Sequence, residues 1–363
     1  MTLVSILGDF HSSILPISYE FKTQMDKHII IYDDAKCDVK RAGHYLEGQK
    51  AFLASLNNRN DKYEIETIKI DEDSYVSMLA CFQKIKQFSD HYSDIYLNAT
   101  DGLSSIGILL TSNLLSIGAK VIAYDRYANT YNLLTSEGME KHYIENNMDI
   151  KSHLLLKGYT LKSVTDKSEL MQRKDAIMEL ASDLTRYKSY ATLYDKKFIP
   201  GTSDYPDYEK ILEEIGKLTN KVFVQGTVFE EYIYHLIIEN FDFDDVWTGV
   251  KVAYKEGVEN EFDVLMIKDN HLHTIECKLV YGLDGEHFVY KTEQIKDYLD
   301  DDGKAMILSI GADNVVRKKN GKKKTQFTLG DFARAELGEV RIHQSKVFDK
   351  EAFLADVKEW FLS

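Results

Sequence analysis

The sequence predicts an α/β protein of two domains joined by a helical connector, and three features of the chain indicate this architecture. The first 125 residues alternate short apolar runs with segments of helical spacing. The middle third is helical in pattern, and from about residue 221 the chain returns to mixed helices and strands. The length of 363 residues is also too great for one typical domain. We therefore expect domains at 1–150 and 221–363, with the connector at 151–220.

The strand patterns of the first domain are evenly spaced along the chain. They cover residues 3–7, 28–34, 63–70, 93–100 and 119–125. Repeated strand–helix units at this spacing predict a doubly wound parallel sheet, which binds ligands outside the carboxyl ends of its strands. Residues 126–150 are less regular and are compatible with an added hairpin.

Composition limits the classes of function. The formal net charge of −14 argues against a protein whose whole surface coats nucleic acid. The three cysteines, Cys37, Cys81 and Cys277, lack C-x-x-C spacing, which favours a reducing cytoplasm and disfavours a zinc knuckle. No stretch reaches the roughly 20 apolar residues that span a bilayer. The start, MTLVSILGDF, lacks the basic segment of a signal peptide. We expect a cytoplasmic protein.

The stretch TIECKL (274–279) is typical of a strand with one buried face. Ile275 and Cys277 alternate with Glu276 and Lys278, which therefore point together to the other face. One interpretation of the acid and the base is a solvated face with a weak ion pair. The other is half of a metal-dependent active site.

A predicted hairpin supplies the second half of this site. The polar loop KDNH separates two strand patterns, and symmetric closure places Ile267 opposite Leu272. By the same count Asp263 lies opposite Glu276, at a Cβ separation of about 5 Å. Two carboxylates at that distance repel each other, and a divalent cation reverses the sign of the interaction. Lys278, on the same face, can then stabilise a nucleophilic water or the charge on a phosphate. His271 and His273 at the hairpin tip are a weaker metal candidate.

Two helical patterns flank this hairpin. In the first, Thr227 and Glu230 have the spacing of a capping box, and the alternative role of Glu230 is to reach the metal or its water. In the second, Lys291, Gln294 and Tyr298 share one helical face. That face is either solvated or in contact with substrate.

The order of these elements resembles the PD-(D/E)xK nuclease superfamily. The matching elements are a helix with Glu230, a strand ending at Asp263, Glu-x-Lys at 276–278, and a helix with Gln-x-x-x-Tyr. No proline precedes Asp263, a variation which that superfamily tolerates. The resemblance implies that Asp263 and Glu276 bind Mg²⁺ or Mn²⁺. The implied catalytic residues are Glu230, Asp263, Glu276, Lys278, Lys291 and Gln294.

A polar loop in the first domain indicates a ligand site. YLNATDGLSSIGILL (96–110) ends a strand and opens a helix, so small polar groups meet a helix N-terminus that suits a phosphate or nucleotide. The simpler interpretation is a helix capped by Asp101 or Ser104. The loop GDFHSS (8–13) would lie beside it in a sheet of the usual strand order.

The whole architecture resembles the CARF-domain nuclease effectors of type III CRISPR defence. That resemblance implies a homodimer that binds a cyclic oligoadenylate, most often cyclic tetra-adenylate, across its interface. It implies metal-dependent cleavage of single-stranded DNA, RNA or supercoiled plasmid. The matching ligand-binding residues are Asp9, Phe10, His11, Ser12 and Ser13 in the first loop, and Asn98, Thr100, Asp101, Gly102, Ser104 and Ser105 in the second.

A basic segment near the C-terminus suits a nucleic-acid substrate. VVRKKNGKKKTQF (315–327) is typical of a hairpin with Asn320-Gly321 in a type I′ turn, and it holds six basic residues. It is either a solvated turn or a clamp on the phosphate backbone.

Two rival functions stay open. One is a CARF regulator without catalysis, although no basic recognition helix is evident. The other is a restriction or repair nuclease without a second messenger, whose first domain should be basic. The acidic stretches DDAKCD and DEDSY in that domain argue against it.

Overall fold

The structure is a computed structural model, and it forms two compact units, Met1–Thr160 and Leu161–Ser363. Each unit is described by itself. The described residues are 1–8, 14–33, 39–56, 62–88, 91–100, 105–184, 226–255, 258–279, 285–310, 317–319, 322–324, 327–345 and 347–363.

The first unit is built on a seven-stranded sheet of order β3-β2-β1-β4-β5-β6-β7. Neighbouring strands from β3 to β5 pair in parallel, whereas β6 and β7 add an antiparallel hairpin. This confirms the predicted doubly wound sheet and the compatible hairpin. The strands are β1 (Thr2–Ile6), β2 (Lys27–Tyr32), β3 (Glu64–Lys69), β4 (Ile95–Asn98), β5 (Lys120–Asp125), β6 (Thr130–Leu134) and β7 (Met139–Tyr143).

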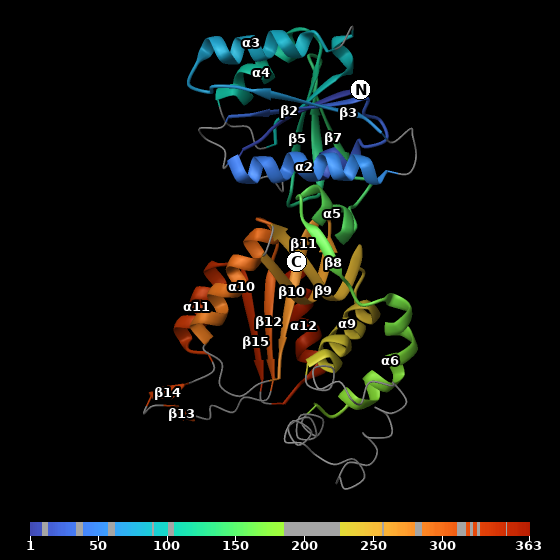
Figure 1. Ribbon diagram of the computed structural model, residues 1–363, viewed down its shortest axis with the longest axis vertical. Coiled ribbons are helices and arrows are strands. Elements are labelled where there is room, and N and C mark those ends of the chain that lie inside the picture. Colours follow the sequence, from blue (N-terminus) through green and yellow to red (C-terminus); the bar gives the residue numbers. More distant parts are fainter. Residues whose placement is uncertain are drawn as a thin grey trace. The chain divides into compact units, whose positions relative to one another are not determined.

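Helices cover both faces of this sheet (Figure 1). On one face, α3 and α4 pack on alternate strand residues such as Val4 and Ile29. On the other face, Leu3 and Ile122 pack with Ile17 of α1. The helices are α1 (Leu15–Glu20), α2 (Val39–Ser55), α3 (Tyr75–Lys86), the short 3₁₀ turn η3 (Tyr92–Asp94), α4 (Ser105–Ser116) and α5 (Ile150–Leu156).

Strand order brings together the strand ends from which the two predicted ligand loops start. β1 pairs with β4, and Ser5 lies opposite Asn98 near the carboxyl ends of both strands. The order of strands reverses between β1 and β4, which is the point where open α/β sheets bind ligands. The loops after these two strands therefore begin side by side, as predicted.

The second unit contains a six-stranded sheet of order β15-β12-β11-β10-β9-β8. β9, β10 and β11 form an antiparallel meander, and β11, β12 and β15 pair in parallel. The strands are β8 (Thr160–Ser163), β9 (Asp245–Lys255), β10 (Val258–Lys268), β11 (His271–Lys278), β12 (Ala305–Ile310) and β15 (Val340–Ser345).

Alternating side chains divide this sheet into two apolar faces, as its period-two pattern requires. Ile275 and Cys277 belong to the cluster beneath α6, α9 and α12. Ala305 and Ile307 pack instead against α10 and α11 (Figure 1). The helices are α6 (Lys167–Ala181), α9 (Val228–Asn240), α10 (Gly285–Leu299), α11 (Leu329–Leu337) and α12 (Lys350–Phe361).

The described part of 151–220 differs from the predicted connector. α5 belongs to the first unit, whereas β8 joins the edge of the second sheet and α6 packs on α9. The apolar side chains of α6, among them Leu170 and Ile177, are buried in the core of the second unit. The helical pattern of α6 was correctly predicted, but its apolar face serves the core of that unit.

The basic segment forms the predicted hairpin. β13 (Arg317–Lys319) pairs antiparallel with β14 (Lys322–Lys324), with Lys319 opposite Lys322. Among the described residues, no helix is both long enough and apolar enough to cross a membrane.

Candidate active site

The hairpin of β10 and β11 has the predicted register. Ile267 lies opposite Leu272, and the ladder continues to Val264 opposite Ile275. Asp269 and Asn270 form the turn with φ values of 51° and 70°, as a type I′ turn requires. The turn is therefore two residues long, and the predicted count across the KDNH loop is confirmed.

Beyond Val264 the backbone ladder between β10 and β11 stops, and Asp263 takes its place. Its Oδ2 accepts a hydrogen bond of 2.7 Å from the Cys277 amide. On the β9 side, the Thr248 hydroxyl donates to the Asp263 carbonyl oxygen at 2.7 Å. The two strands thus separate at Asp263, which opens the end of the hairpin.

Sequence reasoning missed the contribution of β9 to this opening. Gly249 stands opposite Asp263 in the register and has a φ of 60°, a left-handed conformation. A glycine inside a strand marks an irregularity, and this signal was present in the sequence.

Lys278 lies where the two predicted metal-binding carboxylates converge. Its Nζ is 2.7 Å from Glu276 Oε1 and 3.5 Å from Asp263 Oδ2. Burial alone would lower the pKa of Lys278, but Asp263 and Glu276 outweigh it and raise that pKa above its usual value. Lys278 is therefore a fixed positive charge at this position.

Two acids of the site, Asp263 and Glu230, are hard to ionise without a cation. Burial raises the pKa of Asp263 to about 7, Glu276 adds to the rise, and Lys278 opposes it. Burial likewise raises the pKa of Glu230 to about 8, and the charge of Asp263 is the next contribution. Shifts of this kind cluster at functional sites.

The capping box that the spacing of Thr227 and Glu230 suggested is not observed. Thr227 is the N-cap of α9 and makes no side-chain capping hydrogen bond. Glu230 is half-buried, and its side chain forms no hydrogen bond or ion pair with any other described residue. Its carboxylate is electrostatically coupled to Asp263 and Lys278, so α9 contributes a third acid to the site.

α10 borders the same site through one of its two predicted residues. Lys291 lines a small hollow together with Glu261 and Glu276. Gln294 is exposed on the same helix and does not line that hollow. Tyr298, a turn further along, is 53% exposed and packs against Tyr254.

A different group in the second unit has the spacing of metal ligands. Ligating atoms of His271, Asp300 and Asp302 lie within 4.8 Å of one another. Asp300 is also hydrogen-bonded to the amides of Leu272 and Asp302, so it organises the loop beside the hairpin tip. Among the described residues this is the one group of three that meets that spacing, and it lies at the other end of the hairpin from Asp263.

The predicted ligand loops are described only in part. Asn98 ends β4 fully buried, and its Oδ1 accepts hydrogen bonds from the Thr100 amide at 3.2 Å and hydroxyl at 2.6 Å. Asn98 Nδ2 is buried without a hydrogen-bond partner among the described residues. Ser105 is the first residue of α4. The predicted residues Asp9, Phe10, His11, Ser12, Ser13, Asp101, Gly102 and Ser104 lie outside the described residues.

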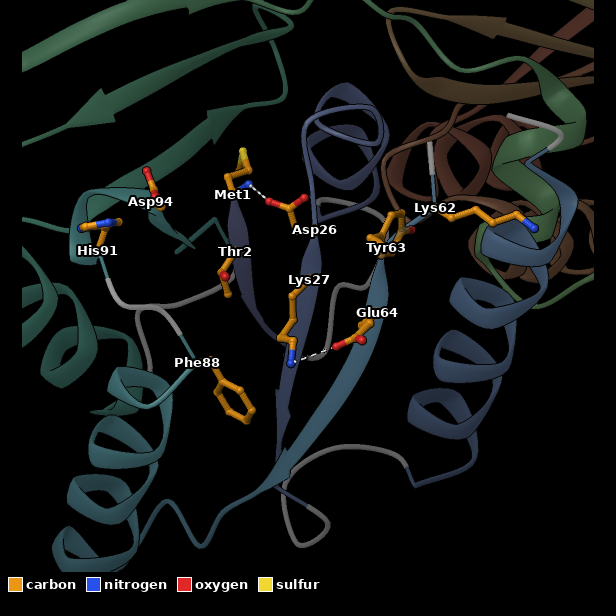
Figure 2. Close-up of a pocket in the computed structure, with 10 residues that line it drawn as sticks. All are labelled: Met1, Thr2, Asp26, Lys27, Lys62, Tyr63, Glu64, Phe88, His91 and Asp94. Atoms are coloured by element: carbon orange, nitrogen blue, oxygen red, sulfur yellow. Dashed lines mark hydrogen bonds and ion pairs between the residues drawn. The ribbon is translucent and has the colours of Figure 1, made fainter. Parts of the chain in front are cut away.

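The first unit has a hollow at the end of its sheet opposite to the carboxyl ends of β1 and β4. It has a volume of about 630 Å³, and Figure 2 shows the residues that line it at the amino ends of β1, β2 and β3. Lys27 pairs with Glu64 at 3.1 Å, and the Met1 ammonium pairs with Asp26 at 2.7 Å. These charges neutralise each other within the hollow, which lies at the amino ends of the strands, whereas the predicted ligand loops start at the carboxyl ends.

Comparison with known proteins identifies the class of the second unit. Residues 218–349 match the sequence model of the Card1-like endonuclease domain. This match to an endonuclease domain confirms the predicted enzyme class. Among curated proteins, no sequence matches the chain.

Two solved structures share the fold of the whole chain. One is Can2 from Sulfobacillus thermosulfidooxidans in complex with cyclic tetra-adenylate, at 15% identity and a TM-score of 0.70. The other is protein VC1899 from Vibrio cholerae, at 17% identity and a TM-score of 0.74. Each alignment covers 99% of this chain and 98% of the other. The predicted α/β architecture, and the resemblance that rested on it, are confirmed at the level of the fold.

Proposed function

We propose that the protein is a metal-dependent endonuclease that cyclic tetra-adenylate activates, and that it acts in type III CRISPR defence. The observation that supports this most is the convergence of Glu230, Asp263, Glu276 and Lys278 at the open end of one hairpin, within an endonuclease domain. The substrate is nucleic acid, as single-stranded DNA, RNA or supercoiled plasmid.

The donor set of the site suits Mg²⁺ or Mn²⁺. Asp263 and Glu276 offer hard carboxylate oxygens. Glu230 offers a third carboxylate, and the pKa of this group is raised. The Lys278 ammonium lies between the carboxylates of Asp263 and Glu276. The combined negative charge of these carboxylates therefore stabilises a cation beside them. When bound, the metal would polarise the scissile phosphate and acidify a water.

The side chains of the site divide the remaining work. Lys278 stabilises the negative charge that develops on the phosphate and orients the attacking water. Glu230, with a pKa of about 8, can hold or release a proton near neutral pH. Lys291, beside Glu261 and Glu276, is placed to hold the strand that is cut. Gln294, exposed on the same helix, contacts the strand further along.

The first unit supplies the proposed sensor. Cyclic tetra-adenylate binds at the carboxyl ends of β1 and β4, where the loops 9–13 and 98–105 begin. The buried Asn98 Nδ2 has no partner among the described residues and can donate to this ligand. Can2, which shares the fold of the whole chain, was solved in complex with cyclic tetra-adenylate, and this supports the choice of a tetramer.

A homodimer completes the proposed sensor. A cyclic tetramer can share the two-fold axis of two identical subunits. α4 begins at the ligand loop and exposes Ile108 at 64%, so its outer face suits a second copy of the chain. Sedimentation of the protein should show a dimer, and a monomer at micromolar concentration would contradict this arrangement.

A basic hairpin is the proposed contact to the phosphate backbone. β13 and β14 bring six basic residues together in a chain of net charge −14. Such a patch attracts nucleic acid in a manner that weakens as salt increases. The proposed function assigns this hairpin to the substrate strand.

A cleavage assay tests the whole proposal. Single-stranded DNA, single-stranded RNA and supercoiled plasmid are incubated with the protein in Mn²⁺, with and without cyclic tetra-adenylate. We expect cleavage of at least one substrate, and we expect the ligand to increase its rate. Substituting Lys278→Ala should lower that rate by about 100-fold or more, because a fixed charge at the scissile phosphate is lost.

The control is Lys268→Ala, which removes a lysine from the same hairpin away from the carboxylates and should keep the wild-type rate. Metal-dependent cleavage that survives in Lys278→Ala would disprove the site. Cleavage that is indifferent to every ring size would leave a nuclease without a second messenger. Ligand binding without any cleavage would favour a regulator.

A further inference from the structure

The strand that opens the active site is held by residues outside the predicted catalytic set. Thr248 on β9 is 1% exposed, and its hydroxyl donates to the Asp263 carbonyl oxygen at 2.7 Å. Asp263 is also held through its carboxylate by the Cys277 amide. The backbone and the side chain of Asp263 are thus oriented by two separate hydrogen bonds.

β9 is itself held at this point by the segment that precedes α6. The Thr165 amide donates to the Thr248 carbonyl oxygen at 3.2 Å. The Thr165 hydroxyl covers the next residue, because a Cβ at Gly249 would lie only 2.5 Å from its Oγ1. The left-handed Gly249 therefore lets Thr165 approach β9 directly opposite Asp263.

Thr165 is close in sequence to the boundary between the two units. The first unit ends at Thr160, and the chain continues as β8, the edge strand beside β9. Thr165 is only five positions after Thr160 in the sequence. A displacement of the chain at the boundary has a short covalent route to Thr165, and from there two hydrogen bonds lead to Asp263.

We propose that Thr248 is a positioning residue for Asp263 and that the path Thr165–Thr248–Asp263 regulates cleavage. It rests on the proposed function and names how that site is controlled. A shift of β8 moves β9 at Thr248, and the hydroxyl of Thr248 transmits the shift to the backbone of Asp263. A two-state change of this kind biases the site without any ligand contact near it.

The test separates the hydroxyl of Thr248 from its shape. Thr248→Val keeps the shape and loses the hydrogen bond, whereas Thr248→Ser keeps the hydroxyl. We expect Thr248→Val to lower kcat about tenfold or more with an unchanged KM, because the reacting groups are misplaced while substrate contacts stay intact. Thr248→Ser should restore most of kcat. Equal kcat in both variants would overturn the proposal.

Thr130→Val is the matched control. Thr130 is also 1% exposed on a strand, but its hydroxyl has no hydrogen-bond partner among the described residues. It lies on β6 of the first unit, so this variant should keep the wild-type kcat. A comparable loss of kcat in Thr130→Val would show that the loss in Thr248→Val is a general effect of the substitution.

The regulatory path is tested separately by the ratio of the cleavage rates with and without cyclic tetra-adenylate. Thr248→Val should reduce this ratio, while titration calorimetry should show that the variant still binds the ligand. An unchanged ratio would overturn the regulatory path. If the wild type cleaves in Mn²⁺ but ignores the ligand, the sensor part of the proposed function fails, and kcat still decides the role of Thr248.

Metal binding gives a test that does not depend on cleavage of the chosen substrates. Calorimetric titration with Mn²⁺ should show about tenfold weaker binding in Thr248→Val and near wild-type binding in Thr248→Ser, because positioning groups behind metal ligands have effects of about this size. Identical Mn²⁺ binding in the three proteins would overturn the positioning role.

Discussion

At the scale of single residues, the site depends on the free energy needed to bury carboxylates close together. Asp263 and Glu230 have raised pKa values because the hairpin end is desolvated and because a neighbouring carboxylate adds negative charge, Glu276 beside Asp263 and Asp263 beside Glu230. Lys278 offsets part of this repulsion through its contacts with Asp263 and Glu276. Sequence reasoning identified these residue types, but it could not show that the Cys277 amide also holds Asp263.

The raised pKa values predict how stability depends on pH without metal. The native pKa values of about 7 for Asp263 and about 8 for Glu230 exceed the ordinary values of 3.8 and 4.5. Between these limits the native state binds more protons than the unfolded state, so stability falls as the pH rises. The melting temperature of the second unit should therefore decrease from about pH 5 to about pH 8.

Thermal melts at a series of pH values check this expectation. Asp263→Asn and Glu230→Gln should each make the decrease shallower, because the buried group no longer ionises. Glu137→Gln removes an exposed acid from the first unit and should keep the wild-type slope. A melting temperature of the second unit that rises over this range would contradict the assignment.

At the scale of the elements, a buried ion pair joins helices α6 and α9. The Arg173 guanidinium makes two hydrogen bonds with Glu231, of 2.6 and 2.7 Å, and both side chains are nearly inaccessible. Glu231 directly follows Glu230 in α9, so this ion pair orients the helix that presents Glu230. The sequence predicted the helical period of α6 but not its packing partner, because an apolar face does not indicate which element it packs against.

Substituting Arg173→Ala should destabilise the second unit by about 3–5 kcal/mol, because Glu231 would stay buried without its partner. Urea unfolding measures this free energy. The neighbouring variant Lys174→Ala removes the more exposed pair with Glu239 and should cost much less, because solvent screens that pair. Equal losses in the two variants would show that burial of the Arg173 pair has no special importance.

At the scale of the whole molecule, the chain combines two compact units with separate cores and separate candidate ligands. The boundary at Thr160 passes directly into β8 of the second sheet. Ligand binding to one unit can therefore affect the other through the short continuous segment at Thr160 and β8. This arrangement suits a sensor joined to an enzyme.

Calorimetry of the full chain should resolve the two units. Cyclic tetra-adenylate at 100 times its Kd should stabilise the first unit by about 2.7 kcal/mol, and Mn²⁺ should raise the transition of the second. In Asp263→Asn the shift with Mn²⁺ should disappear while the shift with cyclic tetra-adenylate stays. A Mn²⁺ shift that persists in Asp263→Asn would place the metal elsewhere, with the group of His271, Asp300 and Asp302 as the next candidate.

The sequence by itself determined the α/β class, the parallel sheet of the first unit and the register of the hairpin. These features depend on local periodicity and turn chemistry, which short stretches of chain specify. Tertiary structure alone decided that the hairpin opens at Asp263, that Thr248 and Cys277 hold it there, and that α6 belongs to the core of the second unit. These contacts join residues distant in sequence, and no local pattern encodes which buried groups meet.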